Sequence, residues 1–230
     1  EIEMIHRAIE KCGRPIVLSL SPGPAMVEQA EHLRKYANLW RITNDFWDCW
    51  ENIMEMFDRC NNWAPYVSEG CFPDCDMLPI GHISIRGCEH GLSDRWTRLS
   101  KAEQRTMLTL WNIFRSPLMI GCELTDMDEW TKLLLTNEEV LALLKKSRNA
   151  HQAIRQGDMI VWQADDEDGN VYLAVFNTTN WSENFAVDFR ALDLSGSYKM
   201  RDLWEKKELG EIEGKLVVEV ESHGAELYRL

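Results

Sequence analysis

The spacing of apolar residues changes its period once along the chain. In the first part, segments with apolar residues at helical spacing alternate with short apolar runs, a pattern typical of a parallel α/β sheet. The helices predicted in this part lie at 2–12, 26–36, 49–60, 101–115 and 140–146. The strands predicted in this part lie at 16–20, 39–44, 77–80 and 118–124. Beyond about residue 150 the period becomes two residues, which indicates β-strands.

This second region predicts an antiparallel β-sandwich. Its strands are predicted at 159–163, 171–177, 184–189, 198–203, 215–220 and 226–230. Turns at 165–169, at 195–196 and at Gly210 separate them. Six short strands with no intervening helix favour a sandwich. We therefore divide the chain into an α/β part, residues 1–149, and a sandwich, residues 150–230.

Local signals define several helix ends. Ser100 with Glu103, and Thr136 with Glu139, have the spacing of capping boxes. Asp48 is expected to cap the helix at 49–60. The polar, glycine-containing stretch at 81–99 predicts a long loop.

Asp45 lies between the strand at 39–44 and the helix at 49–60. In a β/α protein this junction is the carboxyl end of a strand, where such folds place their chemistry. Phe46 and Trp47 are expected to shield the carboxyl group from water, which suits a general acid. The alternative, that Asp45 only caps the turn into the helix, stays open because aspartate is common at helix starts.

Composition excludes some classes of partner. The net charge is −13 and no basic stripe is present, which argues against nucleic acid. No apolar run approaches the roughly 20 residues that span a bilayer, so no membrane partner is expected. With 45% hydrophobic residues and ten tryptophans the chain can bury a large core. Localisation is left open.

The seven cysteines do not predict a disulfide framework, because the number is odd and the spacing irregular. Cys71 with Cys75, and Cys88 with His90, raise the possibility of a metal site. No second pair at zinc-finger spacing accompanies them, and buried free cysteine is common. We expect no metal.

Four segments resemble glycoside hydrolase family 27, the α-galactosidase and α-N-acetylgalactosaminidase family. They are RPIVLSLSPGP (14–24), WRITNDFWDCW (40–50), DCDMLPIG (74–81) and EQRTMLTLWNIFRSPLMIG (103–121). They occur in the family's order, and the resemblance covers nearly the whole chain. It implies the second half of a (β/α)8 barrel followed by an antiparallel β-sandwich, with the four predicted strands as the fifth to eighth of the barrel.

The resemblance also implies roles for individual residues. Asp45 matches the general acid/base, and Arg41 matches an arginine that binds a ring hydroxyl of galactose. Asp76 and Met77 match an Asp-Met pair that lines the sugar pocket. The implied reaction is retaining hydrolysis of terminal α-galactosides without a metal or organic cofactor. Arg41 as a structural ion-pair partner and Met77 as ordinary core remain alternatives.

Two departures from the family pattern matter. No segment matches the family's nucleophile motif, K-x-D-x-C after the fourth strand, and Glu1 begins in the helix that would follow that strand. The chain is therefore expected to lack the nucleophile and to be inactive alone. Ser21 replaces the glutamate that contacts the 2-hydroxyl in typical α-galactosidases, which favours tolerance of N-acetylgalactosamine. A β-L-arabinopyranosidase activity also occurs in the family.

An alternative from another class is a non-catalytic carbohydrate-binding or assembly module, which the fold alone would permit. A half-barrel also leaves strand edges and inner strand faces uncovered. Such surfaces are expected to bind a second copy or the absent N-terminal half-barrel.

Overall fold

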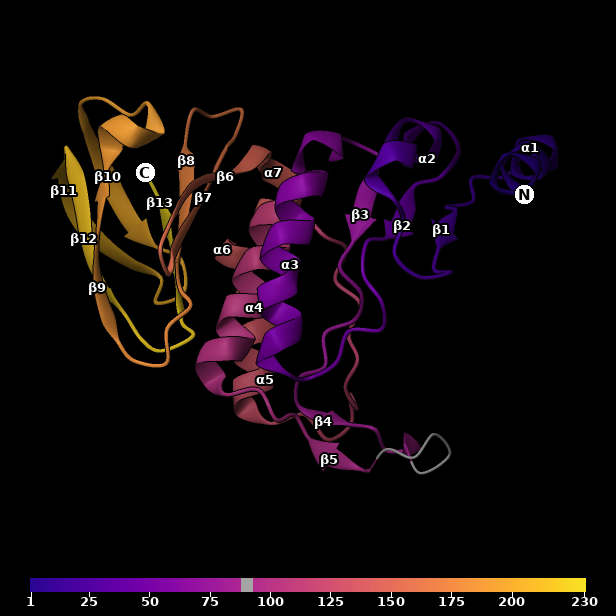
Figure 1. Cartoon of the computed structure of the whole chain (residues 1–230), viewed down its shortest axis with the longest axis horizontal. Coiled ribbons are helices and arrows are strands. Elements are labelled where there is room, and N and C mark those ends of the chain that lie inside the picture. The colour runs from indigo at the N-terminus through magenta and orange to yellow at the C-terminus, as the bar shows by residue number, and fades with distance from the viewer. Residues whose placement is uncertain (88–92) are drawn as a thin grey trace.

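Three short parallel strands form the sheet of the α/β part. The computed structural model describes residues 1–87 and 93–230. β1 (Ser19–Leu20), β2 (Leu39–Arg41) and β3 (Phe72–Asp74) pair in the order β1-β2-β3. Beyond β3, Leu78 forms an isolated parallel bridge with Ile120. β1 therefore lies at one edge of this sheet, and the segment around Ile120 lies beyond β3 on the other side (Figure 1).

The paired segments are shorter than the apolar runs that predicted them. The strand predicted at 77–80 is wrong, because the residues paired with β2 are Phe72–Asp74. The strand predicted at 118–124 is reduced to the single bridge at Ile120. Strands of parallel sheets are usually buried on both faces, but Ile16 and Val17 of the run at 16–20 are 43% and 68% exposed. Apolar residues predict burial without specifying which neighbour supplies the backbone hydrogen bonds.

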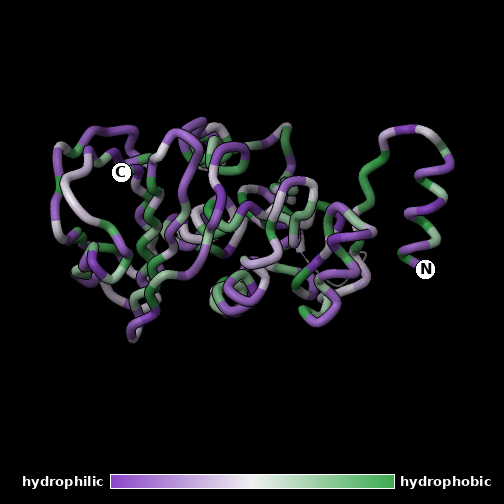
Figure 2. The backbone as a smooth tube through the Cα atoms, turned by 90° about the horizontal axis from the view of Figure 1, so that it is seen from above, coloured by the Kyte–Doolittle hydropathy of each residue, from purple (hydrophilic) through white to green (hydrophobic). Residues whose placement is uncertain are grey.

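α3 and α4 lie between this sheet and the sandwich (Figure 1). Among the described residues, the helices of the α/β part are α1 (Ile2–Cys12), η1 (Val27–Gln29), α2 (Ala30–Tyr36), α3 (Trp50–Trp63), η2 (Ala64–Tyr66), α4 (Lys101–Phe114), α5 (Glu129–Leu135), α6 (Glu138–Leu141) and α7 (Leu143–Lys146). The sequence patterns did not predict α5. α4 is the central helix, with eleven of its fourteen residues buried. α1 has no buried residue and stands away from the body (Figure 2). No described helix is both long and apolar enough to cross a membrane.

The helix starts test the predicted caps. Ser100 caps α4 with both hydrogen bonds of a capping box, so that prediction is confirmed. The box at Thr136 is wrong, because Asn137 is the residue that caps α6. The cap at Asp48 is also wrong: α3 begins one residue later than expected, after Cys49, and Asp48 bonds elsewhere. A capping pattern identifies a helix start only when no stronger partner competes for the side chain.

The stretch predicted as a long loop at 81–99 contains a short hairpin, β4 (His82–Ile83) and β5 (Arg95–Trp96). His82 lies between two carboxylates, with Nε2 2.5 Å from Asp94 and Nδ1 2.8 Å from Asp126. The bond to Asp94, followed by the bond to Asp126, raises the pKa of His82 above its usual value. The bond to Asp126 connects this hairpin to the segment that follows Ile120.

The C-terminal region contains two antiparallel sheets. The larger has the strand order β11-β10-β13-β8-β7-β6 and the smaller pairs β12 with β9. Their bounds are β6 (Arg148–Gln156), β7 (Met159–Asp165), β8 (Val171–Asn177), β9 (Glu183–Asp188), β10 (Ser197–Asp202), β11 (Lys207–Glu213), β12 (Lys215–Val220) and β13 (Ala225–Arg229). All six predicted strands are present. β6 and β11 were not predicted, and Gly210 lies within β11 rather than in a turn.

The central strands of the larger sheet, β7 and β8, are buried on both faces. One face packs against the smaller sheet through residues such as Val161, Val175 and Leu216. The other packs against α3 and α4, where Phe176 contacts Phe57 and Trp162 contacts Phe114. The α/β part and the sandwich therefore share one hydrophobic core. The division at residue 149/150 stays a prediction, although β6 begins close to it.

A turn of the sandwich contacts the starts of α3 and α4. The ring of His223 stacks on Trp50, with 3.9 Å between centroids and 6° between planes. Its Nδ1 lies 2.8 Å from Glu103, the capping-box residue of α4. The backbone oxygen of His223 accepts a hydrogen bond from Thr106 at 2.6 Å. These contacts fix the sandwich turn against the first turns of both helices.

Glu226 of β13 is expected to make stability depend on pH. Burial, followed by the charge of Asp202, raises the pKa of Glu226 from its ordinary value to about 7. The pKa of Glu226 is higher in the folded protein than in the unfolded chain. The stability that depends on its protonated form is therefore fully present below about pH 4.5 and is lost as pH rises through 7. Replacing Glu226 by glutamine should therefore stabilise the protein by about 1–3 kcal/mol at pH 8, with little effect at pH 4.5.

Urea unfolding at the two pH values measures this difference. Glu219→Gln, at an exposed position of β12, is the matched control and should change neither value. Equal effects of Glu226→Gln at both pH values would contradict the role of burial.

Candidate active site

Arg41, the last residue of β2, is the centre of a polar cluster. Its Nη2 donates to Oδ1 of Asp45 at 2.9 Å, and its Nη1 donates to Oγ of Ser21 at 3.1 Å. Nη1 also lies 3.2 Å from Oδ1 of Asp76. Arg41 itself is buried, being 8% exposed. One guanidinium thus brings together four of the five residues singled out in the sequence.

These residues meet because of where they lie on the strands. Ser21 directly follows β1, Asp45 follows β2 in the turn towards α3, and Asp76 follows β3. The carboxyl ends of adjacent parallel strands lie at one edge of a sheet, which is where β/α folds position functional groups. The spacing of four residues between Arg41 and Asp45 lets the chain turn back, so that the two side chains pair.

Asp76 fixes the position of the Asp45 turn. Its Oδ2 accepts a hydrogen bond from the backbone N–H of Phe46 at 2.8 Å. Its own N–H donates to Oδ1 of Asp74 at 2.8 Å, and its carbonyl accepts from Nε1 of Trp111 at 3.3 Å. Asp76 has a φ of 75°, a conformation that costs a non-glycine residue energy and is held by these contacts. Both of its carboxylate oxygens are therefore occupied by the protein.

Burial raises the pKa of Asp74, the residue behind Asp76. The hydrogen bond from the backbone N–H of Asp76 opposes this rise, and the Asp76 carboxylate adds to it. Asp74 is the last residue of β3 and lies opposite Arg41 in the β2–β3 register. Asp74 thus supports the cluster by holding the backbone of Asp76.

The expected shielding of Asp45 is wrong. Its side chain is 83% exposed, whereas that of neighbouring Phe46 is buried against Trp111. Phe46 therefore points into the core, Trp47 is half-buried, and the carboxylate of Asp45 is left in solvent. The other expectation, that Asp45 only caps the turn, is also not what the contacts show, because its partner is the side chain of Arg41.

Met77 does not belong to the hydrogen-bonded cluster. A β-carbon built on Gly121 would lie 2.9 Å from its Sδ and 2.9 Å from the carbonyl oxygen of Leu78. Gly121 is therefore needed for this close approach next to the Leu78–Ile120 bridge. The contact fits the packing alternative for Met77, and its role in sugar binding stays a prediction.

A second ion pair supports the cluster and was missed in the sequence. Asp48 is fully buried and accepts from Nη2 of Arg95 at 2.5 Å and from the backbone N–H of Arg98 at 2.9 Å. The guanidinium of Arg95 also lies 5.9 Å from the ring centre of Trp47. The hairpin β4–β5 is thereby attached to the turn that carries Asp45. Arg95 lies in a polar stretch without periodicity, so the sequence contained no local signal for it.

The cysteines do not form the site considered from their spacing. Cys75 lies 3.5 Å from Cys60 of α3, and both are buried free thiols, whereas Cys71 contacts the backbone of Arg34. Cys88 and His90 lie outside the described residues. Within 1–87 and 93–230, no group of three or more His, Cys, Asp or Glu side chains could hold a metal ion.

Comparison with known families decides what kind of protein this is. A family model described as "Alpha galactosidase A" matches residues 2–146, and one described as "Alpha galactosidase C-terminal beta sandwich domain" matches residues 156–230. The chain belongs to glycoside hydrolase family 27. The expected fold class, the second half of a (β/α)8 barrel followed by a β-sandwich, is confirmed by this membership and by the structures below.

Family 27 relatives match the chain over nearly all of its length. Alpha-galactosidase 2 of Arabidopsis thaliana is 28% identical over 230 residues, which is 98% of this chain and 54% of the relative. A crystal structure of a family 27 β-L-arabinopyranosidase from Geobacillus stearothermophilus is 49% identical, with a TM-score of 0.96. A putative α-N-acetylgalactosaminidase from Bacillus halodurans is 39% identical, with a TM-score of 0.85. All of this chain aligns with each structure and covers 53% of it. The chain thus spans about half the length of these relatives.

Proposed function

We propose that this chain supplies the acid/base part of a retaining glycoside hydrolase that cleaves terminal α-galactosides. The observation that carries the proposal is the Arg41 cluster. It holds Ser21, Asp45 and Asp76 at the carboxyl ends of three adjacent strands and leaves the Asp45 carboxyl group accessible to a substrate.

In this reaction Asp45 first donates a proton to the leaving glycosidic oxygen and then, as a carboxylate, takes a proton from the attacking water. The second carboxylate must attack the anomeric carbon from about 5–5.5 Å away. Asp76 is a poor candidate for this second role, because Arg41 and the N–H of Phe46 occupy its oxygens. The nucleophile is therefore expected from residues outside this chain, which alone should not turn over substrate.

A specific observation favours β-L-arabinopyranosides as a second candidate substrate. The β-L-arabinopyranosidase structure is 49% identical to this chain, a higher identity than that of the α-galactosidases compared. β-L-Arabinopyranose has the ring-hydroxyl configuration of α-D-galactose and lacks only the hydroxymethyl group. The contacts of Arg41 with a ring hydroxyl would therefore suit either sugar.

α-N-Acetylgalactosaminides are the third candidate substrate. The short side chain of Ser21 supports this alternative, as does the likeness to the putative α-N-acetylgalactosaminidase. A substituent at C2 of the sugar needs more room than a hydroxyl group. Serine leaves that room where typical α-galactosidases of the family have glutamate.

Hydrolysis of aryl α-galactoside, aryl α-N-acetylgalactosaminide and aryl β-L-arabinopyranoside tests the proposal. We expect no turnover by the 230-residue chain, and turnover when residues that carry a K-x-D-x-C segment are added upstream or supplied as a second chain. Preference for the α-galactoside would support the main proposal, and preference for another substrate would replace it. Saccharide binding without turnover in the extended protein would favour a non-catalytic module.

The open sides of the α/β part imply a partner. Ile16 and Val17 are exposed beside β1, and Met119 and Ile120 are 45% and 47% exposed on the other side of the sheet. We propose that these edges pair with a second copy or with the remainder of a barrel. Size-exclusion chromatography of the chain at low concentration should show self-association, and a well-folded monomer would contradict it.

A further inference from the structure

A cleft separates the ends of α3, α4 and α7 from the sandwich. Its volume is about 910 Å³, within the range of small-molecule sites. The lining side chains that matter here are Asn61, Glu69, Arg115, Lys146, Asn149 and Asp168. These residues define the helix–sandwich cleft.

The helix–sandwich cleft is separate from the candidate active site. α3 starts five residues after Asp45 and is fourteen residues long, so its far end lies roughly 20 Å from its start. Asn61 lines the cleft near that far end. Arg115, at the C-terminal end of α4, lines it as well. The cleft thus lies at the opposite ends of these helices from Asp45.

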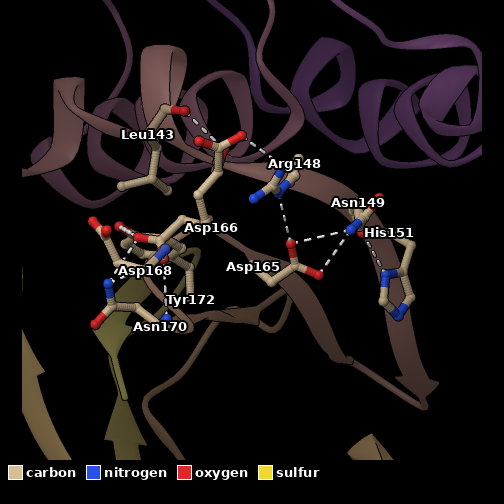
Figure 3. Close-up of polar contacts among 11 residues, drawn as sticks. Leu143, Arg148, Asn149, His151, Asp165, Asp166, Asp168, Asn170 and Tyr172 are labelled. Carbon is tan, nitrogen blue, oxygen red and sulfur yellow. Dashed lines mark hydrogen bonds and ion pairs between the residues drawn. The ribbon is translucent and has the colours of Figure 1, made fainter.

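The sandwich wall of the cleft is rigid (Figure 3). In the turn between β7 and β8, Asp166 accepts hydrogen bonds from the N–H of Asp168 at 2.9 Å, from the N–H of Asn170 at 3.0 Å and from Tyr172 Oη at 2.8 Å. Arg148 of β6 donates to Glu167 of the same turn at 2.9 Å. These bonds hold the backbone of the turn, and the exposed side chain of Asp168 extends from this turn beside the cleft.

The helical wall contains cationic groups with unused donors. Arg115 is half-buried, and its Nε donates to the carbonyl of Leu144 at 3.2 Å. Within the described part of the chain, its terminal nitrogens have no hydrogen-bond acceptor among the side chains and backbone. Burial lowers the pKa of Arg115, and the charge of Glu69 opposes this effect. Lys146 adds a second cation at the end of α7.

Carboxylates and cations therefore line the same cleft. An anion would meet Glu69 and Asp168, and a cation would meet Arg115 and Lys146. A neutral molecule with many hydroxyl groups avoids both repulsions, because each hydroxyl donates to a carboxylate and accepts from a cation or an amide. We propose that the helix–sandwich cleft binds a neutral saccharide at a site independent of Asp45.

Amide NMR shifts test this inference in the Asp45→Asn variant, in which turnover of the added sugar is suppressed. Galactose, melibiose and maltose are titrated separately. We expect at least one of them to shift the amides of 145–151 and 166–169 saturably, with a Kd below about 10 mM. Inorganic phosphate at equal concentration should not displace it. No saturable shift in these segments, or displacement by phosphate, would overturn the proposal.

Substitutions at exposed positions distinguish the cleft from general surface binding. Asp168→Ala and Lys146→Ala should each weaken saccharide binding at least about fivefold, since each removes one hydrogen-bonding group. Lys199→Ala, at an exposed position of β10, is the matched control and should bind as before. Arg115→Gln gives a further test at a half-buried position. Unchanged affinity in all three cleft variants would overturn the assignment.

Discussion

Replacement of Asp45 by asparagine is expected to lower the rate of glycoside hydrolysis about 10²–10⁴-fold in the form of the protein that turns over substrate. The amide is nearly isosteric with the carboxyl group and keeps an oxygen that can accept the hydrogen bond from Arg41. It can neither donate a proton to the leaving oxygen nor take one from water. The fold should be unaffected, because the side chain is almost fully exposed.

Substrates with different leaving groups test whether Asp45 transfers a proton. Substrates with poor leaving groups need the proton most, so their kcat/KM should fall further than that of nitrophenyl glycosides. Glu51→Gln, an exposed carboxylate in the first turn of α3, is the control and should retain full activity. An equal loss for all leaving groups would indicate that Asp45 binds the sugar without transferring a proton.

Replacement of Asp48 by alanine is expected to lower the free energy of unfolding by about 3–5 kcal/mol. The change leaves the largely buried guanidinium of Arg95 without its carboxylate and the N–H of Arg98 without its acceptor. The hairpin β4–β5 would then lose its attachment to the turn that carries Asp45. Urea unfolding measures the loss, and amide shifts at 45–50 report the displacement.

A double-mutant cycle separates the ion pair from general packing. Arg95→Met in the Asp48→Ala background should cost little more than Asp48→Ala alone, because no unpaired charge then remains buried. Arg86→Met, at an exposed position before the undescribed residues, is the control for removing an arginine from this segment. Strictly additive effects of the two substitutions would show that Asp48 and Arg95 do not act as a pair.

The sequence predicts the sandwich more accurately than the half-barrel, for a physical reason. β8 and β12 have the bounds expected from their apolar patterns, because long antiparallel strands contain enough residues to show a period. The barrel strands have only two or three paired residues. Their register is decided by neighbours distant in sequence. For this reason the strand predicted from the apolar run at 77–80 is wrong, and the paired residues are those of β3.

The candidate site was predictable in part. The sequence left open that Arg41 is an ion-pair partner, and the structure shows its ion pair with Asp45. Ser21 and Asp76 come from other strands, and only the resemblance to the family indicated them. Nothing local indicated that Asp48 would pair with Arg95 instead of capping α3. That choice depends on a hairpin which folds back over the turn.

The stacking of His223 on Trp50 bears on how sequence differences among members of this family are interpreted. Trp50 follows Asp45 by five residues, and His223 holds it from a turn close to the C-terminus. A substitution in the turn at 221–224 is thus, in three dimensions, a substitution beside the start of α3, five residues after Asp45. Comparisons of specificity among family members should include this turn with the barrel loops.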